Sequence, residues 1–155
     1  MYKDYDELDN VLTPFKFSNI FDEESLHNIG IGDYNGTINY CGLDVSSSMN
    51  METSTAQIAR LDDFLKSKPV TFIKMDIEGA EMAALHGAAE IITRLRPKLA
   101  ISCYHQHRNG VFMGNSDLFD VPSYVKSLVP EYQILIRHHK LGWDFYETVC
   151  YAIPQ

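Results

Sequence analysis

The chain has 155 residues, enough for one domain with a hydrophobic core, and its 45% hydrophobic content is ordinary for a globular protein. Its formal net charge of -8 argues against binding to nucleic acid or to an anionic membrane surface, because both partners attract a basic face. No apolar run approaches the ~20 residues that span a bilayer. The acidic N-terminus does not resemble a secretory signal. The three cysteines form no CxxC pair. A reduced, cytoplasmic setting is expected.

The first forty residues give a β-hairpin signal after an irregular start. Residues 1–25 are expected to be irregular or helical, since Pro14 interrupts any helix there. Strand-forming runs at 26–32 and 37–41 flank the turn residues of 33–36. Asp, Asn and Gly at such a turn predict that the two runs pair as a hairpin.

The middle of the chain is predicted to be a loop followed by a helix. Residues 43–56 are small and polar, which indicates a loop. The apolar spacing of Ile58, Leu61, Phe64 and Leu65 predicts a helix that ends before a proline.

The C-terminal half shows a clearer alternation of buried strands and amphipathic helices. Strand, helix and strand in succession predict a βαβ crossover, and the last two strands predict an antiparallel hairpin. This half therefore indicates an α/β sheet. The expected order is strand, helix, strand, helix, strand, strand, at 70–75, 79–94, 98–104, 116–129, 132–139 and 145–153.

Three carboxylates follow the predicted strand at 70–75. Asp76 stands at the carboxyl end of that strand, where open α/β sheets bind ligands. Glu78 and Glu81 lie at the start of the next helix, where the helix dipole favours anions, so both have a structural explanation beside a functional one. We expect Asp76 to accept a proton or to bind a hydroxyl group.

Tyr104 and His105 end the next predicted strand. If that strand lies beside the 70–75 strand, His105 faces Asp76. A histidine there can act as a general base, although a purely structural histidine at a strand end is an equal alternative. Asp76 and His105 are the predicted catalytic residues, with Glu78, Glu81 and Tyr104 close to substrate or cofactor.

A metal site is a second alternative. His105 and His107 would project from one face of an extended chain, and with Asp76 they would supply two nitrogen ligands and one oxygen ligand. Residues 109–110, Asn and Gly, instead indicate that an ordinary loop begins there.

Several separate motifs resemble the FkbM family of S-adenosylmethionine-dependent methyltransferases. They occur in order over about residues 26–153, which makes the resemblance specific. They are GIGDYNGTINY at 30–40, ARLDDFL at 59–65, FIKMDIEGAEMAALHGA at 72–88, RPKLAISCYH at 96–105 and YETVCYA at 146–152.

The resemblance implies a partial Rossmann-like class I methyltransferase sheet, α/β and mostly parallel, that closes on a C-terminal antiparallel hairpin. Residues 1–155 would then form a single domain, the C-terminal two-thirds of the methyltransferase fold. The implied reaction is transfer of a methyl group from S-adenosyl-L-methionine to a hydroxyl of a sugar or small natural product.

The Gly-rich strand–turn–helix that begins such a fold, and that holds the cofactor, is not visible in this sequence. The Gly-x-Gly at 30–32 precedes a strand-forming run rather than a helix, so it is expected to belong to a hairpin turn and not to a cofactor loop. The chain would be completed by another chain or an oligomer, or it would be a non-catalytic remnant or assembly module.

Overall fold

The structure, a computed structural model, describes 27–41, 53–105, 107–108, 111–112, 114, 116–139 and 147–155. Within these ranges the side chains at 40–41, 53–54, 107–108 and 111–112 are not described. The prediction for 1–25 lies outside the described residues, as does most of the loop predicted from residue 43 onwards.

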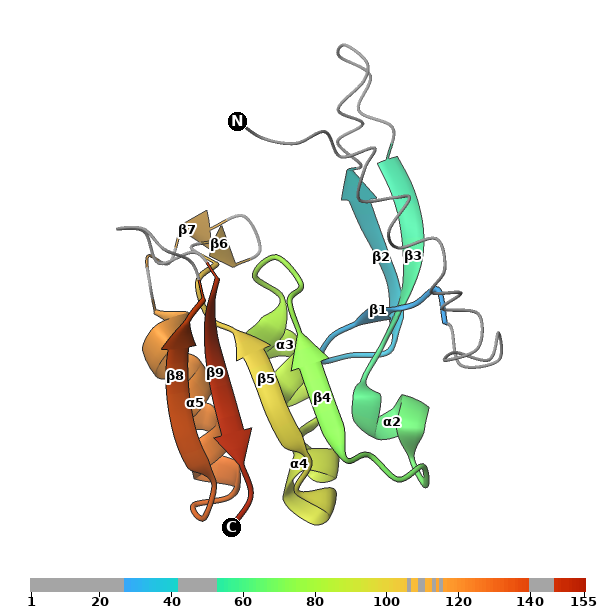
Figure 1. The fold of residues 1–155 in the computed structure, drawn as a ribbon. Helices are drawn as coiled ribbons and strands as arrows, with labels where there is room; N and C mark the ends of the chain where they lie inside the picture. The colour runs from blue at the N-terminus through green and yellow to red at the C-terminus, as the bar shows by residue number, and fades with distance from the viewer. Residues whose placement is uncertain are drawn as a thin grey trace, which may run out of the picture.

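A four-stranded sheet with the order β4-β5-β9-β8 forms the centre of the described fold (Figure 1). β4 (Phe72–Met75) and β5 (Lys98–Ser102) are parallel. β9 (Thr148–Ile153) lies antiparallel between β5 and β8 (Gln133–His138). The closing hairpin is confirmed, but the sheet is mixed rather than mostly parallel. Only nine residues separate β8 from β9 in sequence, fewer than the dozen or more that a parallel crossover needs, so an antiparallel pairing is expected.

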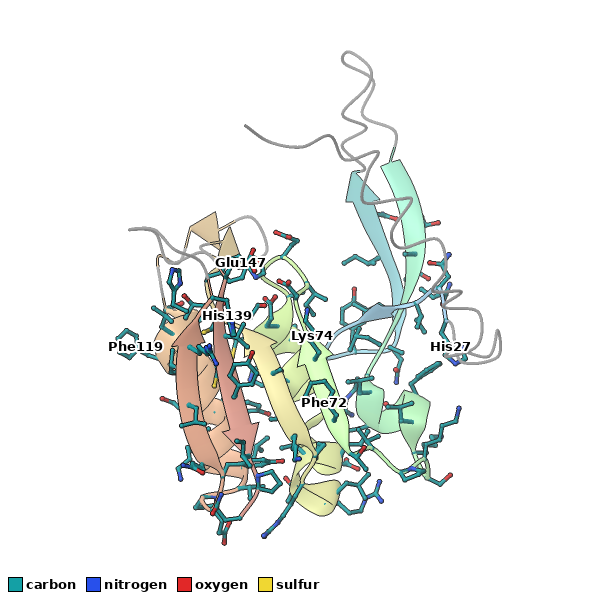
Figure 2. The ribbon with its side chains drawn as sticks, viewed as in Figure 1. His27, Phe72, Lys74, Phe119, His139 and Glu147 are labelled. Carbon is teal, nitrogen blue, oxygen red and sulfur yellow. The ribbon has the colours of Figure 1, made fainter. Side chains whose placement is uncertain are left out.

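Helices of the described chain cover one face of this sheet (Figure 1). They are α3 (Glu81–His86), α4 (Ala89–Leu95) and α5 (Asp117–Leu128). Alternate β4 residues Ile73 and Met75 join the buried cluster beneath the helices. On the other face, Phe72 and Lys74 are exposed (Figure 2).

The single helix predicted at 79–94 is divided into α3 and α4, and Asp62 explains the division. The carboxylate of Asp62 accepts hydrogen bonds from the backbone N–H groups of Glu90 (3.1 Å) and Ile91 (2.9 Å). It therefore caps a new helix start inside the predicted helix. Gly87, at the break, lies so close to Gly32 that an added Cβ would be 1.9 Å from the Gly32 carbonyl oxygen.

A second, three-stranded sheet has the order β1-β3-β2. β1 (Gly30–Ile31) pairs in parallel with β3 (Thr53–Ala59), and β2 (Gly36–Cys41) pairs antiparallel with the same strand. The predicted hairpin between 26–32 and 37–41 is therefore wrong. The turn residue Asn35 is fixed to the segment after β3, because its side chain accepts the Arg60 N–H.

β3 also corrects the two predictions for the middle of the chain. Residues 53–56 belong to a strand and not to a loop, and Ile58 belongs to the same strand rather than to the helix. The helix itself is confirmed only as α2 (Leu61–Leu65).

Two short strands, β6 (His107–Arg108) and β7 (Val111–Phe112), pair antiparallel between the predicted strand at 98–104 and the predicted helix at 116–129. In the described part of the chain, no helix is both long and apolar enough to cross a membrane.

Candidate active site

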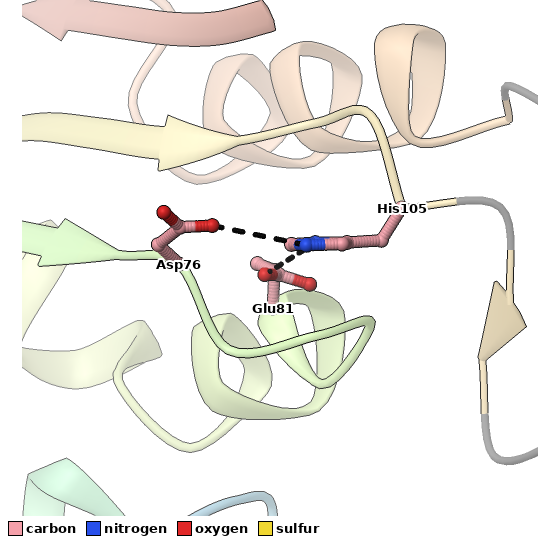
Figure 3. Close-up of side chains that lie close together, drawn as sticks. All are labelled: Asp76, Glu81 and His105. Atoms are coloured by element: carbon pink, nitrogen blue, oxygen red, sulfur yellow. Dashed lines mark ion pairs between the residues drawn. The ribbon is translucent and has the colours of Figure 1, made fainter. Parts of the chain in front are cut away.

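Asp76 and His105 meet beyond the carboxyl ends of β4 and β5 (Figure 3). The two strands are parallel neighbours, so the residues that follow them emerge at the same sheet edge. His105 Nε2 lies 3.7 Å from Asp76 Oδ1. The Tyr104 hydroxyl donates a hydrogen bond of 3.1 Å to the same oxygen.

Glu81 shapes the loop between β4 and α3. Its side chain is fully buried, and its two carboxylate oxygens accept the N–H groups of Ile77 (2.8 Å) and Gly79 (2.9 Å). Glu78 and Gly79 have φ values of 54° and 94°. Positive φ is unfavourable for a residue with a Cβ, so Glu78 is held in a strained conformation by its surroundings. The loop thus wraps around a buried carboxylate.

His105 faces two further carboxylates besides Asp76. Its Nδ1 lies 2.9 Å from Glu81 Oε1, and its Nε2 lies 3.5 Å from Glu78 Oε2. The His105 side chain is only 9% exposed, whereas Glu78 is 89% exposed. Although 2.9 Å is a hydrogen-bond distance, the oxygen lies away from the ring N–H direction. Within the described residues, neither ring nitrogen has a well-directed hydrogen bond.

The surroundings of Asp76 keep it ionised. Burial acts to raise its pKa, but side-chain hydrogen bonds from Ser102 and Tyr104 act in the opposite direction. Electrostatic interactions with Lys74 and His105 add to that effect. The net result is a pKa below the usual 3.8. Burial and the bond to Asp76 raise the pKa of Tyr104 to about 12, so its hydroxyl remains a donor at neutral pH.

The structure brings together all five residues predicted at this edge: Asp76, Glu78, Glu81, Tyr104 and His105. The roles of these residues remain predictions. The predicted metal alternative with His107 is not tested, because the side chain of His107 lies outside the described residues. Instead, ligand atoms of Asp76, Glu81 and His105 lie within 4.8 Å of one another, an arrangement that could hold a metal ion.

The sequence analysis missed Ser102 and Lys74. Both act on Asp76, Ser102 through a hydrogen bond and Lys74 through an ion pair of 3.6 Å. Both could have been found from the two-residue period of a strand, in which residues two apart lie on the same face. Lys74 precedes Asp76 by two residues, and Ser102 precedes Tyr104 by two.

Comparisons with known proteins agree on one family. The family described as "Methyltransferase FkbM domain" matches residues 2–132. A similar solved structure is the crystal structure of methyltransferase FkbM from Methylobacillus flagellatus KT, with 31% sequence identity and a TM-score of 0.63. The match covers 95% of this chain but 32% of that one, so this chain spans about a third of its length. A search of curated proteins gives no significant match.

Proposed function

Since this chain belongs to the FkbM methyltransferase family, we propose that it transfers a methyl group from S-adenosyl-L-methionine to a hydroxyl oxygen of a sugar or small natural product. The observation that carries this proposal is the pairing of Asp76 with His105 at adjacent strand ends. An ionised carboxylate and a buried imidazole together supply two proton acceptors at the edge where such sheets bind ligands.

Methyl transfer to oxygen needs the acceptor hydroxyl to lie in line with the reactive methyl group and to lose its proton. The cofactor supplies that methyl group when it is bound. We assign orientation of the hydroxyl to Asp76, which Tyr104 and Ser102 fix in place. We assign uptake of the proton to His105, because its Nε2 has no well-directed partner in the described structure.

The described residues do not form a Gly-rich cradle for the cofactor. Gly30 lies in β1, and an added Cβ at Gly32 would come within 2.6 Å of the Ile58 side chain. Gly32 therefore allows a close approach to the Ile58 side chain of β3. We therefore assign the binding of the acceptor hydroxyl to this part of the chain, and we assign no residue to cofactor binding.

An assembly role is the second candidate. Among the described strands, β4 lies at the edge of its sheet, and its Phe72 side chain is 57% exposed beside exposed Lys74 (Figure 2). A strand edge with free backbone groups can pair with another chain. A partner or a second copy at this edge would complete a larger methyltransferase sheet.

Calorimetry of the full chain with S-adenosyl-L-methionine separates the two candidates. Micromolar binding supports the enzyme and contradicts a non-catalytic module. Absence of binding up to millimolar cofactor contradicts an enzyme that works as a single chain. Sedimentation of the same sample then shows whether a larger assembly forms.

A further inference from the structure

The methyl-transfer proposal uses Nε2 of His105 as a proton acceptor, and that use requires one tautomer of the neutral ring. An imidazole nitrogen takes up a proton only through its lone pair, so Nε2 must be bare and Nδ1 must carry the hydrogen. Glu81, to which the methyl-transfer proposal assigns no role, stands at the other nitrogen, with its Oε1 atom 2.9 Å from Nδ1.

Glu81 faces Nδ1 as an acceptor. Its side chain has no exposed surface, and its two oxygens accept the N–H groups of Ile77 and Gly79. The contact with Nδ1 is not aligned with the ring N–H direction, but a separation of 2.9 Å still gives it a clear sign. A lone pair on Nδ1 would face the negative charge of the carboxylate, whereas an N–H group would face an opposite charge. Glu81 therefore favours the hydrogen on Nδ1.

Two other carboxylates act in the opposite direction, because they favour a hydrogen on Nε2. Asp76 and Glu78 lie 3.7 Å and 3.5 Å from that atom. Asp76 already accepts the Tyr104 hydroxyl and forms an ion pair with Lys74. Glu78 is 89% exposed, so water screens its charge. Glu81 is both closer to the ring and fully buried, where charges interact through a lower dielectric, so its effect dominates.

The ring is enclosed in a way that keeps these neighbours distinct. The His105 side chain is only 9% exposed, and its ring lies against the Tyr104 ring, with centroids 4.3 Å apart and planes inclined at 41°. Figure 3 shows Asp76 reaching the ring from the end of β4 and Glu81 reaching it from the start of α3. Each nitrogen therefore has its own carboxylate neighbour, Glu81 at Nδ1 and Asp76 at Nε2.

We propose that Glu81 is a positioning residue, which holds the neutral His105 ring in the Nδ1–H tautomer and leaves the Nε2 lone pair for the acceptor hydroxyl. When Nε2 takes the proton, the hydroxyl oxygen keeps the electron pair of its O–H bond for the bond to the methyl group. The ring becomes an imidazolium whose Nδ1–H faces the buried carboxylate, which stabilises the new positive charge. The effect on methyl transfer rests on the proposed function, whereas the tautomer does not.

Nuclear magnetic resonance of the isotope-labelled full chain tests the tautomer through long-range proton–nitrogen correlations of the imidazole rings. The spectra are recorded at a pH high enough that the His105 signals no longer change, and His105→Gln identifies those signals by their loss. We expect a hydrogen on Nδ1 and a bare Nε2. His86, whose ring packs on Tyr124, is the internal comparison and should show the Nε2–H form that neutral histidine prefers in water. A bare Nδ1 in His105, or a ring that keeps both hydrogens wherever the fold is stable, would overturn the proposal.

Glu81→Gln and Glu78→Gln form a matched pair, because each removes one carboxylate charge at a different nitrogen of the same ring. Glu81→Gln should reduce the share of the Nδ1–H form, whereas Glu78→Gln should leave that share at or above the wild-type value. The opposite ranking would count against Glu81 as the determinant. If Glu81→Gln fails to fold, the wild-type and Glu78→Gln spectra still decide the question.

Methyl-transfer kinetics separate this proposal from the proposed function. Folded Glu81→Gln should lower kcat at least about 10-fold, with the KM for the acceptor close to the wild-type value, because Glu81 has no exposed surface for the acceptor to touch. Methyl transfer by a wild type whose His105 has a bare Nδ1 would refute the role of Glu81 alone. An Nδ1–H ring in a wild type that transfers no methyl group would support that role and refute the single-chain enzyme alone.

Discussion

The carboxylate of Glu81 lies 2.9 Å from Nδ1 of His105 and has no exposed surface. The same carboxylate accepts the backbone N–H groups of Ile77 and Gly79. One buried side chain therefore positions both the loop that follows β4 and the ring that follows β5. Glu81, the first residue of α3, therefore supports the candidate site through these contacts.

Glu81→Gln should destabilise the fold by about 1–3 kcal/mol, because an amide offers one acceptor oxygen where the carboxylate offers two to buried N–H groups. Urea unfolding measures the change. Glu90→Gln, at an exposed position of α4, should change the unfolding free energy by less than about 0.5 kcal/mol. Equal stability of the two variants would show that the Glu81 bonds do not support the loop.

Asp62→Ala should lower the free energy of unfolding by about 1–2 kcal/mol, since it removes the cap that starts α4. Thermal unfolding by circular dichroism measures the loss. The neighbouring Asp63→Ala removes an exposed carboxylate that meets the Asn35 side chain, and it should cost less. A larger loss in Asp63→Ala than in Asp62→Ala would contradict the capping role.

Gly87→Ala should destabilise the chain by about 2–3 kcal/mol, because the new Cβ would overlap the Gly32 carbonyl oxygen and force the two segments apart. Backbone conformation is not the reason, since Gly87 has a φ of -74°. Gly30→Ala is the control, with its nearest atom 3.4 Å from the added Cβ. Similar melting temperatures for the two variants would contradict the close approach.

The lowered pKa of Asp76 sets the sign of a pH effect. A carboxylate whose pKa is lower in the folded state stabilises the fold above its unfolded pKa, and the stabilisation disappears as the pH falls through the folded value. Asp76→Asn should therefore be less stable than wild type at pH 7, by at most about 1 kcal/mol for a partly exposed group. The difference should shrink below pH 3.8, the ordinary pKa of the carboxyl. Urea unfolding of the wild type and of Asp76→Asn at pH 7 and at a pH below 3.8 measures the difference in stability. A difference that is larger at the lower pH would contradict the expectation.

Local patterns predicted the part of the fold that carries the site. Apolar runs and helical periodicity identify β4, the helices after it and β5, and the parallel pairing follows from their order. The pairing of β3 was hidden because TSTAQIA is mostly small and polar, and its partners are separated from it in sequence. The break between α3 and α4 was equally hidden, because the capping residue Asp62 lies 28 residues before Glu90.

The candidate site followed from one rule, that residues after adjacent parallel strands share a sheet edge. This rule placed Asp76 beside His105. It could not show that Glu81 bonds to the loop backbone, since those contacts depend on the positive φ values of Glu78 and Gly79. It also said nothing of Ser102, whose effect on Asp76 arises from a neighbouring strand.

Methyl transfer from isotope-labelled S-adenosyl-L-methionine to a panel of hydroxylated sugars, read by product mass spectrometry, tests the proposed roles of Asp76 and His105 most directly. We expect transfer by the wild-type chain. In Asp76→Asn and His105→Ala the transfer rate should fall roughly 10²- to 10⁴-fold, while the calorimetric affinity for the cofactor stays close to that of the wild type. Unchanged transfer rates in both variants would contradict the assignment of Asp76 and His105 to the acceptor hydroxyl.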